Sequence, residues 1–329
     1  MGRSDYRRSA LGVWLAVVLL AGCGGSQVGG SMPMGESVSQ AKAHKMSGLS
    51  GNLLYVTIHG FIYAYTYPGY KQVLTFKSGL YLPDGASDPN NGNLCFASGG
   101  PVLVYAHGST NPLARLSPPS GDETYDCAFD PTTDNLAITI TDFTPGKCWI
   151  AVYTTLSGNP TMYSVPNMSY LRFVGYDGAG DLFVNGDGAS SEVLDELPQG
   201  NSKFLALTLP RQIEELQSIR WDGTYITVRS NTTIYRLRFT GSTGTIVGST
   251  MLTGAEQNNW GDAFTIEGDE VIGPHPEKHP GPYRPLGFWH YPDGDKPFKV
   301  IMVRRPDEGH FGIGTVAVSV APSGSHIRK

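Results

Sequence analysis

The chain has 329 residues, of which 42 are glycine and 23 are proline, while only 16% carry a charge. This composition excludes a helical bundle, a coiled coil and a charge-rich disordered chain. A hydrophobic fraction of 40%, with 17 Tyr and 13 Phe, is enough to form a large core. These features indicate an all-β protein with many turns.

Residues 1–22 have the pattern of an export signal peptide. Three arginines in the first eight residues precede an apolar run, Ala10 to Ala21, which is too short to span a bilayer. The run ends in Leu20-Ala21-Gly22-Cys23, which resembles the lipobox of bacterial lipoproteins. That resemblance implies that Cys23 carries diacylglycerol and an amide-linked palmitate, and that the chain is extracytoplasmic. The alternative is that Cys23 is a plain thiol beside an ordinary cleavage site.

The segment after Cys23 predicts a tether. Residues 23–48 are rich in Gly, Ser, Met, Gln and Lys without apolar periodicity, so we expect a flexible, lipid-anchored linker. The Gly-Gly pair after Cys23 resembles outer-membrane sorting in a cell with two membranes. Removal of residues 1–22 leaves 21 basic and 28 acidic side chains, a net charge of −7. This charge disfavours nucleic acid and anionic lipid as partners, so we expect a monomer that contacts the bilayer only through Cys23.

One short pattern recurs from residue 49 to residue 322. An apolar strand is followed by Asp-Pro or Asp-Gly and then by a second strand, and these Asp residues are predicted to cap tight turns. Markers of the second strands are 41, 42, 46, 44 and 45 residues apart, which is the spacing of propeller blades. Those markers are Leu53, Leu94, Leu136, Leu182, Ile226 and Val271.

This spacing predicts a six-bladed β-propeller with four-stranded blades, because each unit has room for two further strands. The first unit lacks an innermost strand, and Thr315–Pro322 has the character of one. We expect this C-terminal strand to pair with Leu53–Thr57 and to close blade 1. Residues 323–329 are then a disordered tail.

The blade sequences also resemble a known group of proteins. Leu53-Leu54-Tyr55-Val56, Ile62-Tyr63-Ala64-Tyr65 and Tyr67-Pro68-Gly69 resemble NHL and YVTN-type propeller repeats, and most of all the repeats of uncharacterised bacterial propeller lipoproteins. The resemblance covers roughly residues 50 to 322 and concerns blade geometry. It implies binding of proteins, peptides or sugars, while a minority of six-bladed relatives are hydrolases or lactonases.

Candidate ligand-binding residues gather on the face where blades connect. The loop from Gly273 to Pro285 contains two His, and residues from blade 1 and from the link into the closing strand are expected nearby. Imidazoles with carboxylates suit a zinc-like cation. The simpler alternative is a solvated Pro-rich loop that displays polar residues, and contacts to a nonmetal ligand are a third. This candidate rim consists of His59, His275, His279, Asp307 and His310.

A second candidate group lies where the innermost strands begin. Carboxylates and amides around a channel mouth are suited to Ca²⁺ or a sugar, but charged groups also line wet channels without any ligand. This candidate mouth consists of Glu123, Asp126, Glu215, Asn259, Trp260 and Asp262. Zn²⁺ and Ca²⁺ are the only cofactors that these two groups suggest.

Catalytic motifs do not decide the function. The sequence has no GxSxG elbow, P-loop or dinucleotide fingerprint. Cys95, Cys127 and Cys148 remain after lipidation, so at least one is unpaired. Cys127 and Cys148 are expected two strands apart, beyond disulfide reach, so we expect buried thiols.

Two functions remain open. The first is a membrane-anchored binding or scaffold propeller for a protein or carbohydrate partner, which is not an enzyme. The second is a metal-assisted, lactonase-like hydrolase that uses the rim or the channel mouth. The lipid anchor and the absence of a catalytic motif favour the first.

Overall fold

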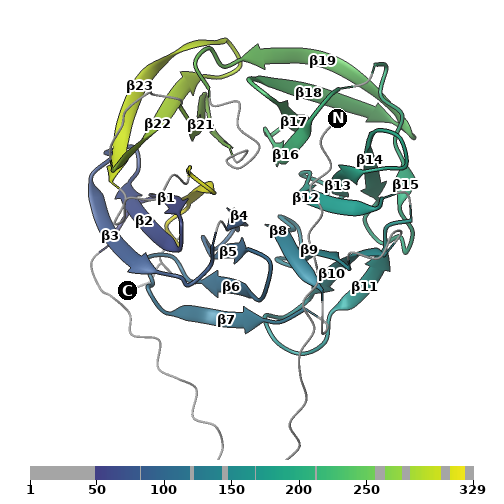
Figure 1. Ribbon diagram of the computed structural model, residues 1–329, viewed down its shortest axis with the longest axis horizontal. Coiled ribbons are helices and arrows are strands. Elements are labelled where there is room, and N and C mark those ends of the chain that lie inside the picture. The colour runs from purple at the N-terminus through teal and green to yellow at the C-terminus, as the bar shows by residue number, and fades with distance from the viewer. Residues whose placement is uncertain are drawn as a thin grey trace, which may run out of the picture. The chain divides into compact units, whose positions relative to one another are not determined.

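The computed structural model describes residues 49–81, 83–118, 122–142, 147–166, 168–211, 213–255, 264–275, 282–304 and 312–322. The predicted signal peptide (1–22), tether (23–48) and tail (323–329) lie outside these residues. The described residues form strands and turns in a ring of six antiparallel sheets, as predicted (Figure 1). No helix among them is long and apolar enough to cross a membrane.

Each sheet is a blade of four strands that follow one another from the channel outwards. In this order, blade 1 contains β24 (Val316–Ser319), β1 (Leu53–Ile58), β2 (Phe61–Thr66) and β3 (Gln72–Lys77). Blade 2 contains β4 (Asp84–Ser87), β5 (Leu94–Ala97), β6 (Val102–Tyr105) and β7 (Pro112–Leu116). Blade 3 contains β8 (Glu123–Phe129), β9 (Leu136–Thr141), β10 (Cys148–Tyr153) and β11 (Thr161–Ser164).

The second half of the ring repeats this order. Blade 4 contains β12 (Tyr170–Tyr176), β13 (Leu182–Asp187), β14 (Glu192–Leu197) and β15 (Leu205–Ala206). Blade 5 contains β16 (Leu216–Trp221), β17 (Ile226–Ser230), β18 (Thr233–Thr240) and β19 (Thr243–Met251). Blade 6 contains β20 (Thr265–Glu267), β21 (Glu270–Pro274), β22 (Tyr283–His290) and β23 (Gly294–Arg304).

The predicted closure of the ring is confirmed. In Figure 1, β24 lies beside β1, and the two strands pair antiparallel from Leu53 opposite Ser319 to Val56 opposite Val316. A second contact joins blade 1 to blade 6, because Tyr67 donates a hydrogen bond of 2.8 Å to the carboxylate of Glu270. The two ends of the propeller are therefore joined by backbone pairing and by side chains.

The core lies between neighbouring blades. One cluster combines Val56 of β1 and Val316 of β24 with Ile272 and Phe288 of blade 6, and all four are at most 1% exposed. Burying an aliphatic or aromatic side chain of this size stabilises a fold by about 1.5–3 kcal/mol. Strands that pack on both sides must be apolar on both faces, which explains their nearly continuous hydrophobic sequences.

The recurrent Asp residues make the predicted turns. Asp88, Asp130, Asp177 and Asp222 each follow an innermost strand, and each carboxylate accepts a hydrogen bond of 2.8 Å from the backbone N–H two residues later. These turns connect the first and second strands of blades 2 to 5. We call the face on which they lie the turn face, and the opposite face, where blades connect, the connection face.

The prediction of free thiols is wrong for two cysteines. Cys95 of β5 and Cys127 of β8 form a disulfide, with Cα atoms 6.2 Å apart. These strands belong to neighbouring blades that face each other, so their side chains come within disulfide range. Cys127 and Cys148 lie on β8 and β10, separated by β9, and Cys148 is a buried free cysteine.

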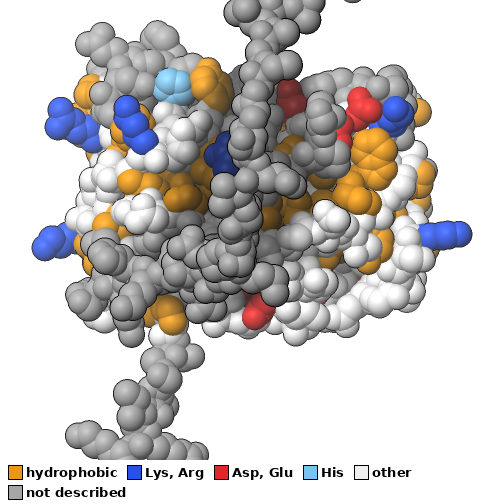
Figure 2. All heavy atoms as spheres, turned by 90° about the horizontal axis from the view of Figure 1, so that it is seen from below, with side chains coloured by type: hydrophobic (Ala, Val, Ile, Leu, Met, Phe, Trp, Pro, Cys, Tyr) orange, Lys and Arg blue, Asp and Glu red, His pale blue; other side chains and the backbone are white. Residues whose placement is uncertain are grey.

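The edge of the ring mixes charged and hydrophobic side chains. Figure 2 shows this edge, where Lys and Arg project between hydrophobic side chains. Leu113 of β7 and Met162 of β11 are 55% and 41% exposed on two outermost strands. Scattered exposure of this kind is ordinary for a protein surface.

The disulfide should stabilise the contact between blades 2 and 3. Its cysteines are 32 residues apart in the sequence, and closing a loop of that length stabilises a fold by about 3–4 kcal/mol in the chain-entropy model. We expect Cys95→Ala to lower the free energy of unfolding by about this amount in a non-reducing urea titration. Dithiothreitol should lower it in the wild type but not in Cys95→Ala, and equal sensitivity of both would contradict the assignment.

Candidate functional site

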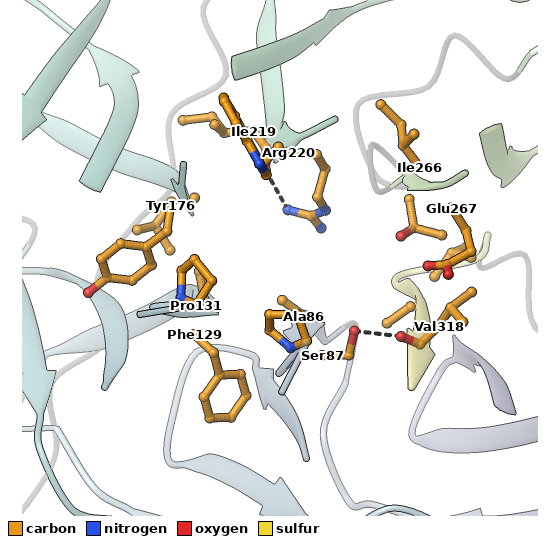
Figure 3. A pocket seen from close by; sticks show the side chains of 18 of the residues that line it. Ala86, Ser87, Phe129, Pro131, Tyr176, Ile219, Arg220, Ile266, Glu267 and Val318 are labelled. Carbon is orange, nitrogen blue, oxygen red and sulfur yellow. Dashed lines mark hydrogen bonds between the residues drawn. The ribbon is translucent and has the colours of Figure 1, made fainter. Parts of the chain in front are cut away.

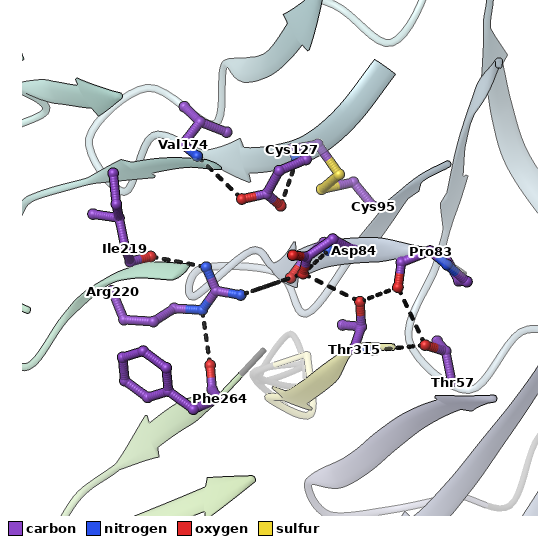
Figure 4. Close-up of polar contacts among 12 residues, drawn as sticks. Thr57, Pro83, Asp84, Cys95, Cys127, Val174, Ile219, Arg220, Phe264 and Thr315 are labelled. Atoms are coloured by element: carbon purple, nitrogen blue, oxygen red, sulfur yellow. Dashed lines mark hydrogen bonds and ion pairs between the residues drawn. A yellow bond between two sulfur atoms is a disulfide. The ribbon is translucent and has the colours of Figure 1, made fainter. Parts of the chain in front are cut away.

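Arg220 of β16 crosses the central channel. Its Nη1 donates to the carbonyl oxygen of Ile219 at 2.8 Å, and its Nε donates to that of Phe264 at 3.0 Å. Its Nη2 donates to the carbonyl oxygen of Gly85 at 3.1 Å, on β4 of the opposite blade (Figure 4). One guanidinium thus connects blades 5, 6 and 2 across the axis of the ring.

Two carboxyl groups lie beside this guanidinium. Oδ1 of Asp84 is 3.8 Å from Nη2 of Arg220, and the two side chains are 16% and 12% exposed. Asp126 of β8 is fully buried and accepts hydrogen bonds from the backbone N–H groups of Cys127, at 2.7 Å, and Val174, at 3.1 Å (Figure 4). Burial raises the pKa of Asp126 well above its ordinary value, and the charge of Asp84 raises it further. Burial also raises the pKa of Asp84, against the opposing effect of Arg220.

A cavity of about 210 Å³ occupies the turn-face half of the channel, and we call it the channel cavity. Every innermost strand contributes residues from its C-terminal part, as Figure 3 shows for Ala86, Phe129 and Val318. Arg220 lines the cavity, whereas Asp84, the first residue of β4, and Asp126, in the middle of β8, do not. The cavity therefore ends at the guanidinium of Arg220 and opens towards the turn face.

The walls of the channel cavity are mostly apolar. Ser87 places a hydroxyl there, but this group already donates a hydrogen bond of 2.6 Å to the carbonyl oxygen of Val318 (Figure 3). Glu267, the last residue of β20, adds a half-buried carboxyl group at the turn-face end. Burial raises the pKa of Glu267, as does the nearby charge of Glu270. The apolar wall is formed mainly by Ala86, Ala128, Val174, Ile219, Ile266, Val316 and Val318.

A second cavity of about 520 Å³ lies between blades 4 and 5. Aromatic side chains of Phe183, Trp221 and Phe239 line it together with three carboxyl groups. Burial raises the pKa of Glu196 to about 7, helped by the charges of Asp181 and Asp177. An acidic cluster of this kind attracts cations but does not by itself define a ligand.

The candidate rim is described only in part. His59 forms the turn between β1 and β2 at φ 40° and packs edge-on against Tyr81, with ring centroids 5.0 Å apart. His275 follows β21 in blade 6, and its ring lies 6.1 Å from that of Trp289. The imidazole of His59 therefore packs near Tyr81, and that of His275 packs near Trp289. The remaining rim residues, His279, Asp307 and His310, lie outside the described residues.

The candidate mouth separates into different environments. Glu123 accepts a hydrogen bond of 2.7 Å from the hydroxyl of Tyr125, whose ring packs 4.9 Å from that of Tyr170. Burial and these contacts raise the pKa of Tyr125. Asp126 is buried against blade 4 instead of lining the mouth, and Glu215 is an exposed residue at φ 53° before β16. Asn259, Trp260 and Asp262 fall in segments that the structure leaves undescribed.

Across the described part of the chain, no group of three His, Cys, Asp or Glu side chains is arranged to hold a metal ion. The rim and mouth residues outside the described ranges are not covered by this result. The prediction of a zinc or calcium site therefore remains a prediction.

Sequence reasoning missed Arg220 and Glu267, although an alignment of the repeats contains a signal for the first. The residue two positions before the turn Asp is Ala86, Ala128 or Gly175 in blades 2 to 4, but Arg220 in blade 5. All four line the channel cavity. Ala86 and Ala128 leave the axis open, and Gly175 lets its strand approach Ile219 of β16 closely. The long cationic side chain at the same position in blade 5 closes the channel.

Comparison with known proteins supports the fold. No protein-family model and no curated protein matches the chain. A protein of unknown function from Bacteroides caccae is 13% identical, with a TM-score of 0.56, and the match covers 82% of this chain and 99% of that one. A functionally unknown protein from Desulfotomaculum acetoxidans is 12% identical, with a TM-score of 0.52 and the same coverages. At these identities, the similarity shows the propeller fold alone.

Glu196 should make the stability of the folded protein depend on pH. Its ordinary pKa is 4.5 and its folded-state pKa is about 7, so in this window the folded state keeps a proton that the unfolded state has released. The contribution of Glu196 to stability is therefore present below about pH 4.5 and is lost as the pH rises through about 7. We expect urea titrations at pH 5 and pH 8 to show a smaller pH effect in Glu196→Gln than in the wild type.

Glu214→Gln is the matched control, because Glu214 is an exposed residue of the same type. It should retain the pH effect of the wild type. An unchanged pH effect in Glu196→Gln would contradict the assignment.

Proposed function

We propose that this chain is a lipid-anchored, extracytoplasmic binding propeller that holds its ligand in the channel cavity. The observation that carries this proposal is the cavity itself, which ends at Arg220 and opens at the turn face. Binding sites are typically concave and mostly apolar, with a few polar groups that orient the ligand. The channel cavity has this character, since apolar residues surround Arg220, Ser87 and Glu267.

The rigidity of the walls supports binding. The cavity is built from six innermost strands, each paired along one edge with the second strand of its blade. Four of the turns at its opening are held by Asp side chains. A site formed in advance loses little conformational freedom when the ligand enters. The occupant of the cavity would be a small molecule or a small group of the expected protein or carbohydrate partner.

The proposed location rests on the lipobox-like sequence at Cys23. Several acyl chains on one residue give durable membrane attachment, whereas one chain does not. The tether predicted for residues 23–48 would keep the propeller clear of the bilayer and leave both faces accessible. The location and the cavity together support a receptor-like role at a bacterial surface.

Ligand binding in the channel can be tested without knowing the natural ligand. Saturation-transfer NMR with a panel of monosaccharides, dipeptides, small acids and small amines should show at least one binder. Ser87→Trp places an indole at a partly buried position on the cavity wall and should abolish that signal. Ser157→Trp adds the same ring at an exposed turn of blade 3 and should leave the signal intact. A panel without binders, or a signal that Ser87→Trp leaves unchanged, would refute the proposal.

Anchoring predicts a change of location when the lipidation site is removed. In a bacterial host that processes lipoproteins, Cys23→Ser should move the protein from the membrane fraction to the soluble fraction and abolish incorporation of labelled palmitate. Ser26→Ala, three residues later, should change neither result. Membrane retention of Cys23→Ser would show that the anchor lies elsewhere.

A further inference from the structure

The channel cavity ends at a cation with unused hydrogen-bond donors. A guanidinium carries five N–H groups, and Arg220 directs three of them at backbone carbonyl oxygens. Oδ1 of Asp84 is too far from Nη2, at 3.8 Å, for a direct hydrogen bond. Among the described residues, one N–H on Nη1 and one on Nη2 therefore have no acceptor.

The positive charge of Arg220 borders the cavity, whereas the nearby carboxyl groups that could neutralise it do not. Arg220 lines the cavity, whereas Asp84 and Asp126 do not. Burial also favours the protonated form of both carboxyl groups, which weakens their neutralisation of the guanidinium. A group that enters from the turn face thus meets a largely buried cation that still has donors to offer.

The shape and lining of the cavity limit the ligand. A volume of about 210 Å³ corresponds to about seven water molecules at about 30 Å³ each. Ala, Val and Ile contribute nine of the nineteen lining residues, and two prolines and three aromatic residues add further apolar surface. A short hydrocarbon body fits this lining, because burying apolar surface is favourable and the walls offer it few competing polar groups.

We propose that the channel cavity binds a small aliphatic monocarboxylate, whose two oxygens accept the remaining N–H groups of Arg220. This inference rests on the proposed function, because it assigns a ligand class to the same cavity. Arginine and carboxylate groups form strong paired hydrogen bonds when their geometry matches. Glu267 at the turn-face end selects against a second negative charge, so dicarboxylates bind more weakly.

Pentanoate is the probe, and three compounds of similar length are its controls. Isothermal titration calorimetry on the intact propeller should detect pentanoate, while pentanamide and pentylamine bind at least about ten-fold more weakly because a charge-assisted pair is lost. Glutarate, which adds a second carboxylate, should also bind more weakly than pentanoate. Equal affinities for pentanoate and pentanamide would overturn the assignment.

Two variants test the residues. Arg220→Lys keeps the charge but removes the paired donors, so pentanoate affinity should fall about ten-fold or more. Glu267→Gln, at a half-buried position beside a turn, should improve glutarate binding by up to about five-fold relative to pentanoate. This second variant and the amide comparison decide the question even if Arg220→Lys fails to fold. If the ratio of glutarate to pentanoate affinity is the same in Glu267→Gln as in the wild type, the role of Glu267 is overturned.

The experiment separates this inference from the proposed function. If a sugar or an amine occupies the channel and pentanoate does not, the binding function stands and the carboxylate assignment fails. If no solute of any class binds, both fail. Tighter binding of glucuronate or of an alanine dipeptide than of pentanoate would overturn the aliphatic assignment by placing the carboxylate on a sugar or a peptide.

Discussion

The free edges of the innermost strands are the constraint on which the channel depends. Each innermost strand pairs with one neighbour in its sheet, so its other edge turns backbone N–H and C=O groups towards the axis. Arg220 donates to carbonyl oxygens of blades 5, 6 and 2, and Asp126 accepts N–H groups of blades 3 and 4. The guanidinium of Arg220 only donates, and both carboxyl oxygens of Asp126 accept. The two side chains therefore bind opposite kinds of exposed backbone group, C=O and N–H respectively.

This structural role also creates the candidate site. Because Arg220 reaches the opposite blade, its guanidinium closes the channel partway along, and the cavity is what remains on the turn-face side. The backbone takes three of its N–H groups, and only the remaining two are available to a ligand. A side chain that forms a structural connection can therefore also provide the recognition group.

The repeat was readable from the sequence because blades 2 to 5 share the same turn chemistry. Asp88, Asp130, Asp177 and Asp222 mark the end of an innermost strand, and the spacing between units gives the number of blades. The closing strand followed from counting, since the first unit had no innermost strand and the C-terminus supplied one. The disulfide between Cys95 and Cys127 could not be found this way, because strand spacing gives distances within a sheet but not between facing sheets. Arg220 was missed for a similar reason, since its contacts cross the ring and join residues far apart in the sequence.

The channel cavity and the predicted rim draw on different parts of the blades. Loops on the connection face vary in length and carry many polar residues, so they attract attention as binding sites. The channel cavity depends on the small residues Ala86 and Ala128, which leave space at the axis, and on Arg220, which limits its depth. Strands and capped turns fix its shape, so under the proposed binding function the selectivity would come from the few polar groups within it. Arg220 and Glu267 carry opposite charges at different points of its lining, and this polarity would orient any charged ligand that enters.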